Sequence, residues 1–588
     1  MIDALLIAPF IFAGVASLLL GKRSKRYASY LSIASALIGT LMATYAVISE
    51  NVAAVTRYTW IAFGGYSINI SLTDAHLNML LVLLIYIIAP LIMFYSLGFM
   101  DKRDEQSRFY FEINMFAAAM ILFAISANLL TMIVAWEWLG ITSYLLIGFW
   151  YHKKRAARAA RMSITIIVFG DIAMLAALIV LWSTYGSTSF TYLLSQAASP
   201  IISVIGILIA LAIFTKSAQF PFMGWLAEAM EGPTPVSAFL HSSTMVKAGV
   251  FLAIVLMPIF YETHIINLFL LFGIITALIG ITNAVSAKHI KKILAYSTME
   301  DLGLMMVAVG LNSIAAAIFF FVVQTFYKAL LFLDAGAVMR ANGEKESIFE
   351  MRGSRSNRLL FATMAIGALS IAGIFPFSGF LGKIGIDAQA ATNIPLYAIL
   401  IAIDFVSSAY IFRWLFVPMR QTSDTVLIGR YKRLPKSMVL PGVILAVSVF
   451  AADIIYFKLP AYLSIASISV GALHAVIESV AVALGLIISY YVYARSHMLK
   501  RHKSISMLLH NQLITEALYY SVGSVFYKVG YAFEYFERYL YRFVKIIGAL
   551  VYEAGGQIRR SVNGDVNLYV AGVAIGFIIM LLFVVFYL

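Results

Sequence analysis

Sixteen apolar stretches, each about 20 residues long, divide this chain and limit what it can fold into. A helix of that length crosses the hydrocarbon core of a bilayer and satisfies all of its own backbone hydrogen bonds there. With 62% hydrophobic and 12% charged residues, the chain is too apolar for a soluble globule. The sequence therefore predicts an all-α polytopic membrane protein, with spans near residues 2–20, 29–49, 77–99, 111–127, 129–150, 160–184, 201–223, 235–258, 265–286, 290–310, 313–339, 359–389, 395–418, 438–457, 470–493 and 568–588.

Positive charge is concentrated in every second connection between these spans. The odd-numbered connections are basic, whereas the even-numbered ones contain only Arg57 and Lys458. One odd-numbered connection, Ala227 to Pro235, is acidic instead. By the positive-inside rule, the basic connections lie in the cytoplasm and both termini lie on the outer side of a prokaryotic cell membrane. The apolar start, Ala4 to Leu20, is long enough to be a first span and does not resemble a cleaved signal peptide.

The stretch from Phe214 to Val250 departs from an ordinary spanning helix. Lys216 ends an apolar run, Pro221 interrupts the helix, and the helix that resumes after Pro235 carries His241 and Lys247. A lysine near the bilayer centre costs about 2.5–3.5 kcal/mol on insertion scales, so it needs a partner or a wet cavity. Broken helices that carry ionisable groups are typical of ion sites in transporters. The stretch therefore predicts an ion path.

A second copy of the break follows 155 residues later. FPFMGWL at 220–226 recurs as FPFSGFL at 375–381, with Lys216 before the first copy and Lys383 after the second. The two copies are five spans apart, and because five is odd, successive copies must be inverted in the membrane. The sequence thus predicts two inverted five-helix repeats with broken helices.

Glu137 and Lys328 are further ionisable residues inside apolar spans. Glu137 lies between Trp136 and Trp138, and an unpaired carboxylate buried there would take up a proton. We therefore expect it to pair with Lys216 and hold that lysine charged, although a static buried pair is the alternative. Lys328 lies within an apolar run and is a candidate central relay. Asp404 with Arg413 is a candidate structural pair, and a structural role is also favoured for Asp171, Asp301, His474 and Glu478.

Several long motifs resemble one family, the antiporter-like subunits of complex I-type respiratory enzymes. They are WEWLGITSYLLIGFW (136–150), KSAQFPF with EGPTPVSAFLHSSTMVKAG (216–249), KKILAYST (291–298) and TFYKALLFL (325–333). The late charged segment, followed by NGDVN (563–567) and a last apolar stretch, is most similar to the distal, L-type members. The resemblance implies fourteen core helices, a long lateral amphipathic helix that clasps neighbouring subunits, and a final anchoring helix.

The resemblance also implies roles for individual residues. Glu137 and Lys216 match the gating pair on the uptake side, His241 and Lys328 the relays, and Lys383 the lysine that faces the outer exit. The motif around Lys247 is closer to multisubunit sodium/proton antiporters.

The chain departs from the family at some positions. Family members usually carry histidines four and eight residues before the central lysine, where this chain has Gln324 and Phe320. The acid that commonly follows the exit lysine is Ile384 here, which leaves Asp387 as a substitute, and Asp334 is a candidate compensating acid near Lys328.

The expected organisation follows from these patterns. The segment near 504–560 is too charged and aromatic to span a membrane, and as one helix it would reach about 85 Å. A bent surface hairpin of two helices is the alternative. The predicted parts are helices 1–3 (1–100), a first repeat (111–258), a second repeat (265–418), two further spans (438–493), the lateral helix (504–560) and a last span (568–588).

The sequence predicts a proton-translocating membrane-arm subunit of a complex I-like NADH (or other donor):quinone oxidoreductase. The chain has no cysteine for an iron–sulfur cluster, no nucleotide-binding motif, no cluster of metal ligands and no sign of a nucleic-acid role. Flavin, iron–sulfur clusters and quinone are therefore expected in partner subunits, with none on this chain. The alternatives are a subunit of a multisubunit Na⁺/H⁺ antiporter, the membrane arm of an ion-pumping hydrogenase, and a structural clamp that does not pump.

Overall fold

The computed structural model describes residues 2–20, 25–49, 55–63, 66–101, 104–196, 199–468 and 470–495, and a few separate residues between 539 and 579. The chain divides into two units, residues 1–510 and 511–588, and all the continuously described residues belong to the first. The predicted lateral helix and last span lie outside the continuously described residues.

The first half of the described chain is helical apart from one hairpin of strands. Its elements are α1 (Ile2–Leu5), α2 (Ala8–Leu20), α3 (Lys25–Ile48), β1 (Val55–Phe63), β2 (Tyr66–Thr73), α4 (His76–Phe99), α5 (Gln106–Ala124), α6 (Leu129–Ile147), α7 (Lys154–Tyr185), α8 (Phe190–Ser195), α9 (Pro200–Lys216), α10 (Gly224–Glu228), the 3₁₀ turn η1 (Ala229–Glu231), α11 (Thr234–Ser242), α12 (Met245–Val255) and α13 (Met257–Glu262).

The second half is entirely helical in its regular elements. These are α14 (Ile266–Ser286), α15 (Ile290–Gly310), α16 (Ile314–Ala341), the 3₁₀ turn η2 (Ser354–Ser356), α17 (Arg358–Ala372), α18 (Ser378–Ala390), α19 (Ile394–Phe416), α20 (Thr425–Lys432), α21 (Lys436–Leu463), α22 (Ala472–Ser489) and the π-helical turn η3 (Tyr490–Arg495). Eleven helices in the described residues are long and apolar enough to cross a membrane. The chain is therefore a multi-pass membrane protein.

The antiparallel hairpin of β1 and β2 was not predicted. Its strands pair from Val55 with Thr73 to Phe63 with Tyr66, in the connection between the second and third predicted spans. The base of the hairpin is fixed to the turn between α5 and α6, where the amide of Ala127 donates to Ser71 O at 2.9 Å and Asn128 Nδ2 donates to Asn69 O at 2.8 Å. The hairpin therefore braces the helix that carries Glu137.

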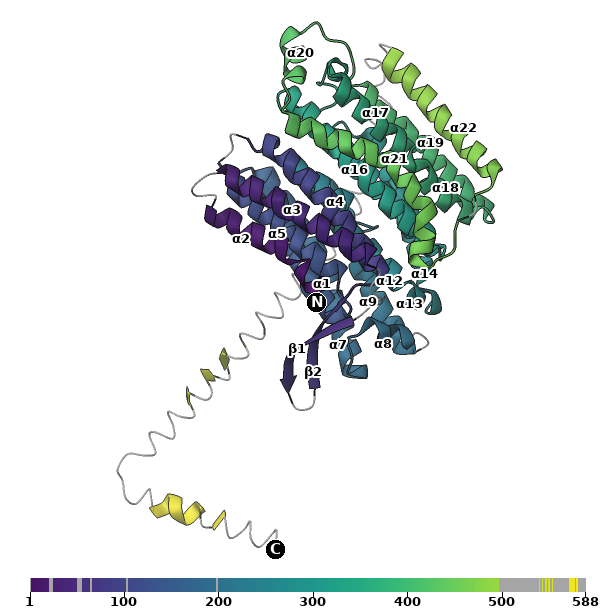
Figure 1. The fold of residues 1–588 in the computed structure, drawn as a ribbon. Coiled ribbons are helices and arrows are strands. Elements are labelled where there is room, and N and C mark those ends of the chain that lie inside the picture. Colours follow the sequence, from purple (N-terminus) through teal and green to yellow (C-terminus); the bar gives the residue numbers. More distant parts are fainter. Residues whose placement is uncertain are drawn as a thin grey trace. The chain divides into compact units, whose positions relative to one another are not determined.

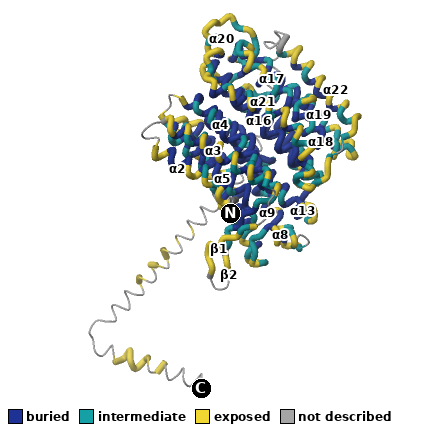
Figure 2. The backbone as a smooth tube through the Cα atoms, viewed as in Figure 1, coloured by how far each residue is buried: buried dark blue, intermediate teal, exposed yellow. Residues whose placement is uncertain are grey.

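The helices pack as one bundle with α16 along its middle. Figure 1 shows α2 and α3 on one side and α19 and α22 on the other, with α4, α16 and α21 between them. All the residues in the apolar 18-residue stretch of α16 are buried, whereas 22% of those in the corresponding stretch of α22 are buried. Exposed residues accordingly lie on the outward faces of the peripheral helices (Figure 2), where apolar side chains such as Leu41 and Ile172 are suited to lipid. The central helix can thus hold charged side chains away from lipid.

Besides the short turn between α1 and α2 in the first predicted span, three predicted spans are interrupted. The span at 201–223 ends as a helix at Lys216, and the span at 359–389 divides into α17 and α18 around Gly373–Phe377, as the two FPF motifs predict. Both Phe–Pro bonds, Phe220–Pro221 and Phe375–Pro376, are cis.

The third interruption was not predicted, because the sequence indicates a continuous helix over 235–258. The structure ends α11 at Ser242 and begins α12 at Met245. The Thr244 hydroxyl donates to Phe239 O at 2.6 Å and so occupies a carbonyl at the end of the α11 ladder. Hydroxyl side chains that bond back to the helix in this way bend or break it. This break separates His241 from Lys247.

Two facing glycines bring α15 into close contact with α14. A Cβ placed on Gly273 would lie 2.7 Å from Gly303 O, and one on Gly303 would lie 2.6 Å from Gly273 O. Neither position has room for a side chain, and small residues at such contacts are how helices approach closely in membranes. The contact fixes α15, which carries the buried acids Glu300 and Asp301.

Candidate functional site

Lys216 lies at the end of α9 and is fully buried. Its Nζ donates to Trp136 O at 2.9 Å, lies 3.7 Å from Asp171 Oδ1, and sits 4.6 Å from the centre of the Trp136 ring. Trp136 Nε1 donates to the same Asp171 oxygen at 2.7 Å. The lysine is therefore held by one carboxylate on α7 and by both the backbone and the ring of a tryptophan on α6.

The expected contact between Glu137 and Lys216 is not the one that the structure contains. Lys216 forms its ion pair with Asp171, for which the sequence favoured a structural role. Glu137 lies next to Trp136 on α6 and is only half-buried. Consecutive residues of a helix point about 100° apart, so Glu137 is offset from Trp136, whose ring and carbonyl contact Lys216, and it acts on the lysine as a nearby charge without forming the ion pair.

His241 and Lys247 lie on either side of the break between α11 and α12. Lys247 Nζ donates to Phe321 O at 2.5 Å and to Thr325 Oγ1 at 2.6 Å, and it lies 4.5 Å from the centre of the Phe321 ring. Within the described residues it is held by neutral acceptors and no carboxylate. The His241 ring stacks on Phe332 at 5.6 Å, and neither of its nitrogens has a hydrogen-bond partner among those residues.

Hydrogen bonds connect these groups from the first broken helix to α16. The Ser217 hydroxyl, next to Lys216, donates to Val246 O at 2.7 Å, next to Lys247. Lys247 in turn donates to Thr325, one helical turn before Lys328. The segments that carry Lys216, Lys247 and Lys328 are thus in direct contact with one another.

Lys328 is paired with an acid on α15. Its Nζ lies 3.0 Å from Asp301 Oδ2 and donates to Ser297 Oγ at 2.5 Å, and the Tyr327 hydroxyl donates to the same Asp301 oxygen at 3.2 Å. All four side chains are buried. Asp334, a candidate partner from the sequence, is also buried on α16, but the ion pair of Lys328 is with Asp301.

Lys383, on α18, contacts two acids. Its Nζ lies 2.9 Å from Asp404 Oδ1 on α19 and 3.4 Å from Glu300 Oε1 on α15. Glu300 also accepts hydrogen bonds from the Ser407 hydroxyl and, at 2.5 Å, from Tyr410. Consecutive residues of α15, Glu300 and Asp301, therefore serve different lysines and join Lys328 to Lys383.

The proposed pair of Asp404 with Arg413 is wrong. Asp404 pairs with Lys383, while Arg413 Nη2 donates to Ala284 O at 2.8 Å and Ala287 O at 2.7 Å. The two residues are nine positions apart on α19, which is two and a half turns, so their side chains point to opposite sides. Asp387, the expected substitute acid, lies near Asp404 and Glu478. The sequence predicted no cluster of metal ligands, and in the structure these three carboxylates lie close enough together to hold a metal ion.

Two family models match this chain. One, described as NADH:quinone oxidoreductase/Mrp antiporter, TM, matches residues 126–409, and the other, described as NADH-Ubiquinone oxidoreductase (complex I), chain 5 N-terminus, matches residues 60–110. The chain belongs to this family of antiporter-like subunits. The first match contains Glu137, Lys216, His241, Lys247, Lys328 and Lys383.

Curated relatives are named as subunits of NADH-quinone oxidoreductases. Subunit L from Mycobacterium tuberculosis is 38% identical over 333 residues, which is 55% of this chain and 53% of the relative. The chain thus matches about half the length of that relative. Subunit L from Campylobacter jejuni is 28% identical over 598 aligned positions, which cover 98% of both chains.

Two solved structures share the fold. The Mrp complex from Dietzia sp. DQ12-45-1b matches with a TM-score of 0.77 and 22% identity over 100% of this chain and 63% of the other. The membrane-bound sulfane sulfur reductase, an archaeal respiratory membrane complex, matches with a TM-score of 0.69 and 19% identity over 83% of this chain and 99% of the other.

Proposed function

We propose that this chain is a proton-translocating, L-type subunit in the membrane arm of a complex I-like quinone oxidoreductase. The observation that carries the proposal is the line of buried ionisable side chains from Asp171 and Lys216 through Lys247 and Lys328 to Lys383. Buried charges in a membrane protein are expensive and mark ion pathways. Electron transfer, with its flavin, iron–sulfur clusters and quinone, would take place in partner subunits.

The geometry suggests how protons would move. Asp171 holds Lys216 charged, and a shift of α9 that lengthens this contact would leave an isolated buried ammonium, which gives up its proton. Among the described residues Lys247 has only neutral acceptors, so it can receive or release a proton without breaking an ion pair. Lys328 and Lys383 are then paired with the adjacent acids Asp301 and Glu300, respectively, and Lys383 is the exit group.

Glu137 and His241 keep their proposed places in this path. Glu137 is half-buried beside the tryptophan that holds Lys216, and so suits proton uptake. The free ring nitrogens of His241 suit a relay through water.

The proposed topology has sixteen spans with both termini on the outer side, two inverted five-helix repeats and a lateral helix that clasps neighbouring subunits. Contacts between two connections support the orientation. The acidic connection Ala227–Pro235 and the basic start of α15 are both predicted to be cytoplasmic, and Lys292 Nζ lies 2.7 Å from Glu228 Oε1. The acidic connection is the exception to the positive-inside pattern, and its Glu228 is thus neutralised by a lysine on the same side of the membrane.

Purification of the native assembly through a tag on this chain tests the proposal. The mass of the assembly, its flavin and iron–sulfur spectra and its quinone reductase activity are the readouts. Iron–sulfur signals with quinone reduction are expected. Nickel with hydrogen evolution would instead indicate a hydrogenase membrane arm.

A Na⁺/H⁺ antiporter subunit is the second candidate, favoured by the match of the Mrp complex along the whole chain and by Lys247. It predicts a colourless assembly of membrane proteins that exchanges Na⁺ for H⁺ without redox activity.

The exit role of Lys383 has its own test. Lys383→Ala should lower the number of protons pumped per electron pair in proteoliposomes, and an unchanged stoichiometry contradicts that assignment.

A further inference from the structure

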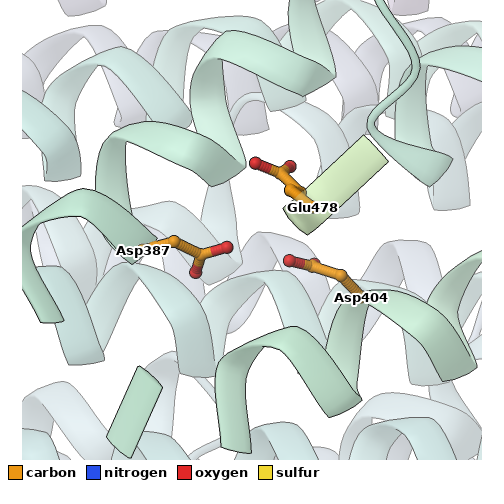
Figure 3. Close-up of side chains that lie close together, drawn as sticks. All are labelled: Asp387, Asp404 and Glu478. Carbon is orange, nitrogen blue, oxygen red and sulfur yellow. The ribbon is translucent and has the colours of Figure 1, made fainter. Parts of the chain in front are cut away.

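Three carboxylates from three helices meet beyond Lys383. Asp387 is on α18, Asp404 on α19 and Glu478 on α22, and one oxygen from each lies within 4.8 Å of the others. Figure 3 shows the three side chains directed toward a common space. Glu478 comes from a helix outside both predicted repeats, so the arrangement extends beyond the line of lysines and acids that ends at Lys383.

Glu478 is the member that points most strongly to a ligand. Its side chain is fully buried, and neither carboxylate oxygen has a hydrogen-bond partner among the described residues. Asp387 Oδ2 and Asp404 Oδ2, also buried, lack one as well. A buried polar group without a partner costs about 1–3 kcal/mol, and an ionised one more, so four such oxygens facing one space need either protons or a counter-charge.

The lysine next to the cluster does not supply enough charge. Lys383 is the cation in contact, and it is shared between Asp404 and Glu300. Asp387 and Glu478 form no ion pair within the described residues. With Asp404 counted against Lys383, these two carboxylates remain uncompensated.

We propose that Asp387, Asp404 and Glu478 bind a hard cation of the size of Na⁺ or Ca²⁺. Hard cations take oxygen ligands, and Ca²⁺ binds them at about 2.3–2.6 Å. Three oxygens spaced evenly around one such ion are about 4.0–4.5 Å apart, so oxygens within 4.8 Å of one another need to move by a few tenths of an ångström at most to bind it together. Ca²⁺ would neutralise both uncompensated carboxylates, whereas Na⁺ would leave one proton.

The position of the cluster implies that the bound cation would come from the outer medium. This step rests on the proposed orientation, in which α18 ends and α22 begins on the outer side. Asp387 is three residues before the end of α18, and Glu478 is six residues after the start of α22, or about 9 Å along that helix. A cation bound here would lie between Lys383 and the outer face. Its positive charge would contribute to the electrostatic field in which that lysine releases its proton.

Equilibrium binding of ²²Na⁺ and ⁴⁵Ca²⁺ to the intact purified assembly, at rest and without substrate, tests the proposal. We expect one equivalent of one of these ions to be lost in Glu478→Gln. Asp334→Asn is the matched control, since it removes a buried carboxylate on α16 away from the cluster and should keep that equivalent.

Glu478→Asp covers the case in which the glutamine variant fails to assemble. It keeps the charge but withdraws the ligand, so the same site should bind at least about tenfold more weakly. If the assembled variants bind both ions as the wild type does, the three carboxylates hold protons and the proposal is wrong. Failure of the proposed function would appear separately, as a loss of redox-driven pumping with ion binding at rest unchanged.

Discussion

Lys216 Nζ lies 3.7 Å from Asp171 Oδ1, while Trp136 Nε1 donates to that same oxygen at 2.7 Å. The acid that compensates the first buried lysine is therefore on α7 and is itself positioned by a ring on α6. Trp136 also accepts from Lys216 through its carbonyl, at 2.9 Å. One tryptophan thus fixes both members of the ion pair.

Asp171→Asn should slow proton pumping more than Glu137→Gln. Loss of one partner from a buried pair leaves an uncompensated charge, at a cost of about 3–5 kcal/mol, whereas Glu137 is half-buried and its neutralisation leaves the pair intact. We expect a fall of at least about tenfold for the Asp171 variant, measured as the initial rate of proton uptake into proteoliposomes. Asp453→Asn, which neutralises a half-buried acid on α21, is the control. A larger effect from Glu137→Gln would show that Glu137, and not Asp171, gates Lys216.

Lys328 and Asp301 should behave as a coupled pair in assembly. Either Lys328→Met or Asp301→Asn alone leaves a buried charge without its partner at 3.0 Å, while the double variant removes both charges. We expect the double variant to give more assembled complex than either single variant, with a coupling energy of about 1–3 kcal/mol. Native gels and thermal unfolding of solubilised membranes provide the measurement. Additive losses would show that the two side chains do not interact energetically.

Sequence patterns predicted the helical class, the positions of most spans and the two proline breaks. These predictions succeeded because the length of an apolar run and the position of a proline are both read directly from neighbouring residues in the sequence. The hairpin at 55–73 was missed although the sequence indicates it, because two runs rich in β-branched and aromatic residues flank the turn-forming pair Gly64-Gly65. The break between Ser242 and Met245 was missed because Thr244 takes a carbonyl that only its own helix geometry brings into reach.

The lysines of the site were all predicted, but their partners were not. A lysine in an apolar span can be recognised from the sequence alone. The acid that pairs with it depends on how helices far apart in the sequence pack together. Glu300 was overlooked although it adjoins Asp301, and it contacts Lys383 from 83 residues away. Its position as an acid inside the predicted span 290–310 was the signal that could have indicated a buried role, as it did for Glu137.

Thr325→Val should weaken transport while preserving the fold. The hydroxyl accepts a hydrogen bond from Lys247 at 2.6 Å, and hydrogen bonds to charged groups contribute about 1.5–3 kcal/mol. We expect pumping to fall by about tenfold, with assembly close to wild type because valine keeps the shape of threonine. Thr282→Val is the control, since the Thr282 hydroxyl bonds only to its own helix, at 3.0 Å. Equal rates for both variants would remove Lys247 from the path.

Gln324→Met should separate stability from transport at the position where the family resemblance leads us to expect a histidine. Gln324 is fully buried on α16, and neither end of its amide has a hydrogen-bond partner among the described residues. A buried amide without a partner costs about 1–3 kcal/mol, so an apolar side chain of similar size should raise the thermal stability of the assembly. If Gln324 instead orders water between Lys247 and Lys328, the same variant should slow pumping severalfold, and Gln324→His should restore it. A variant that is more stable and pumps at the wild-type rate would show that the proton path does not pass this residue.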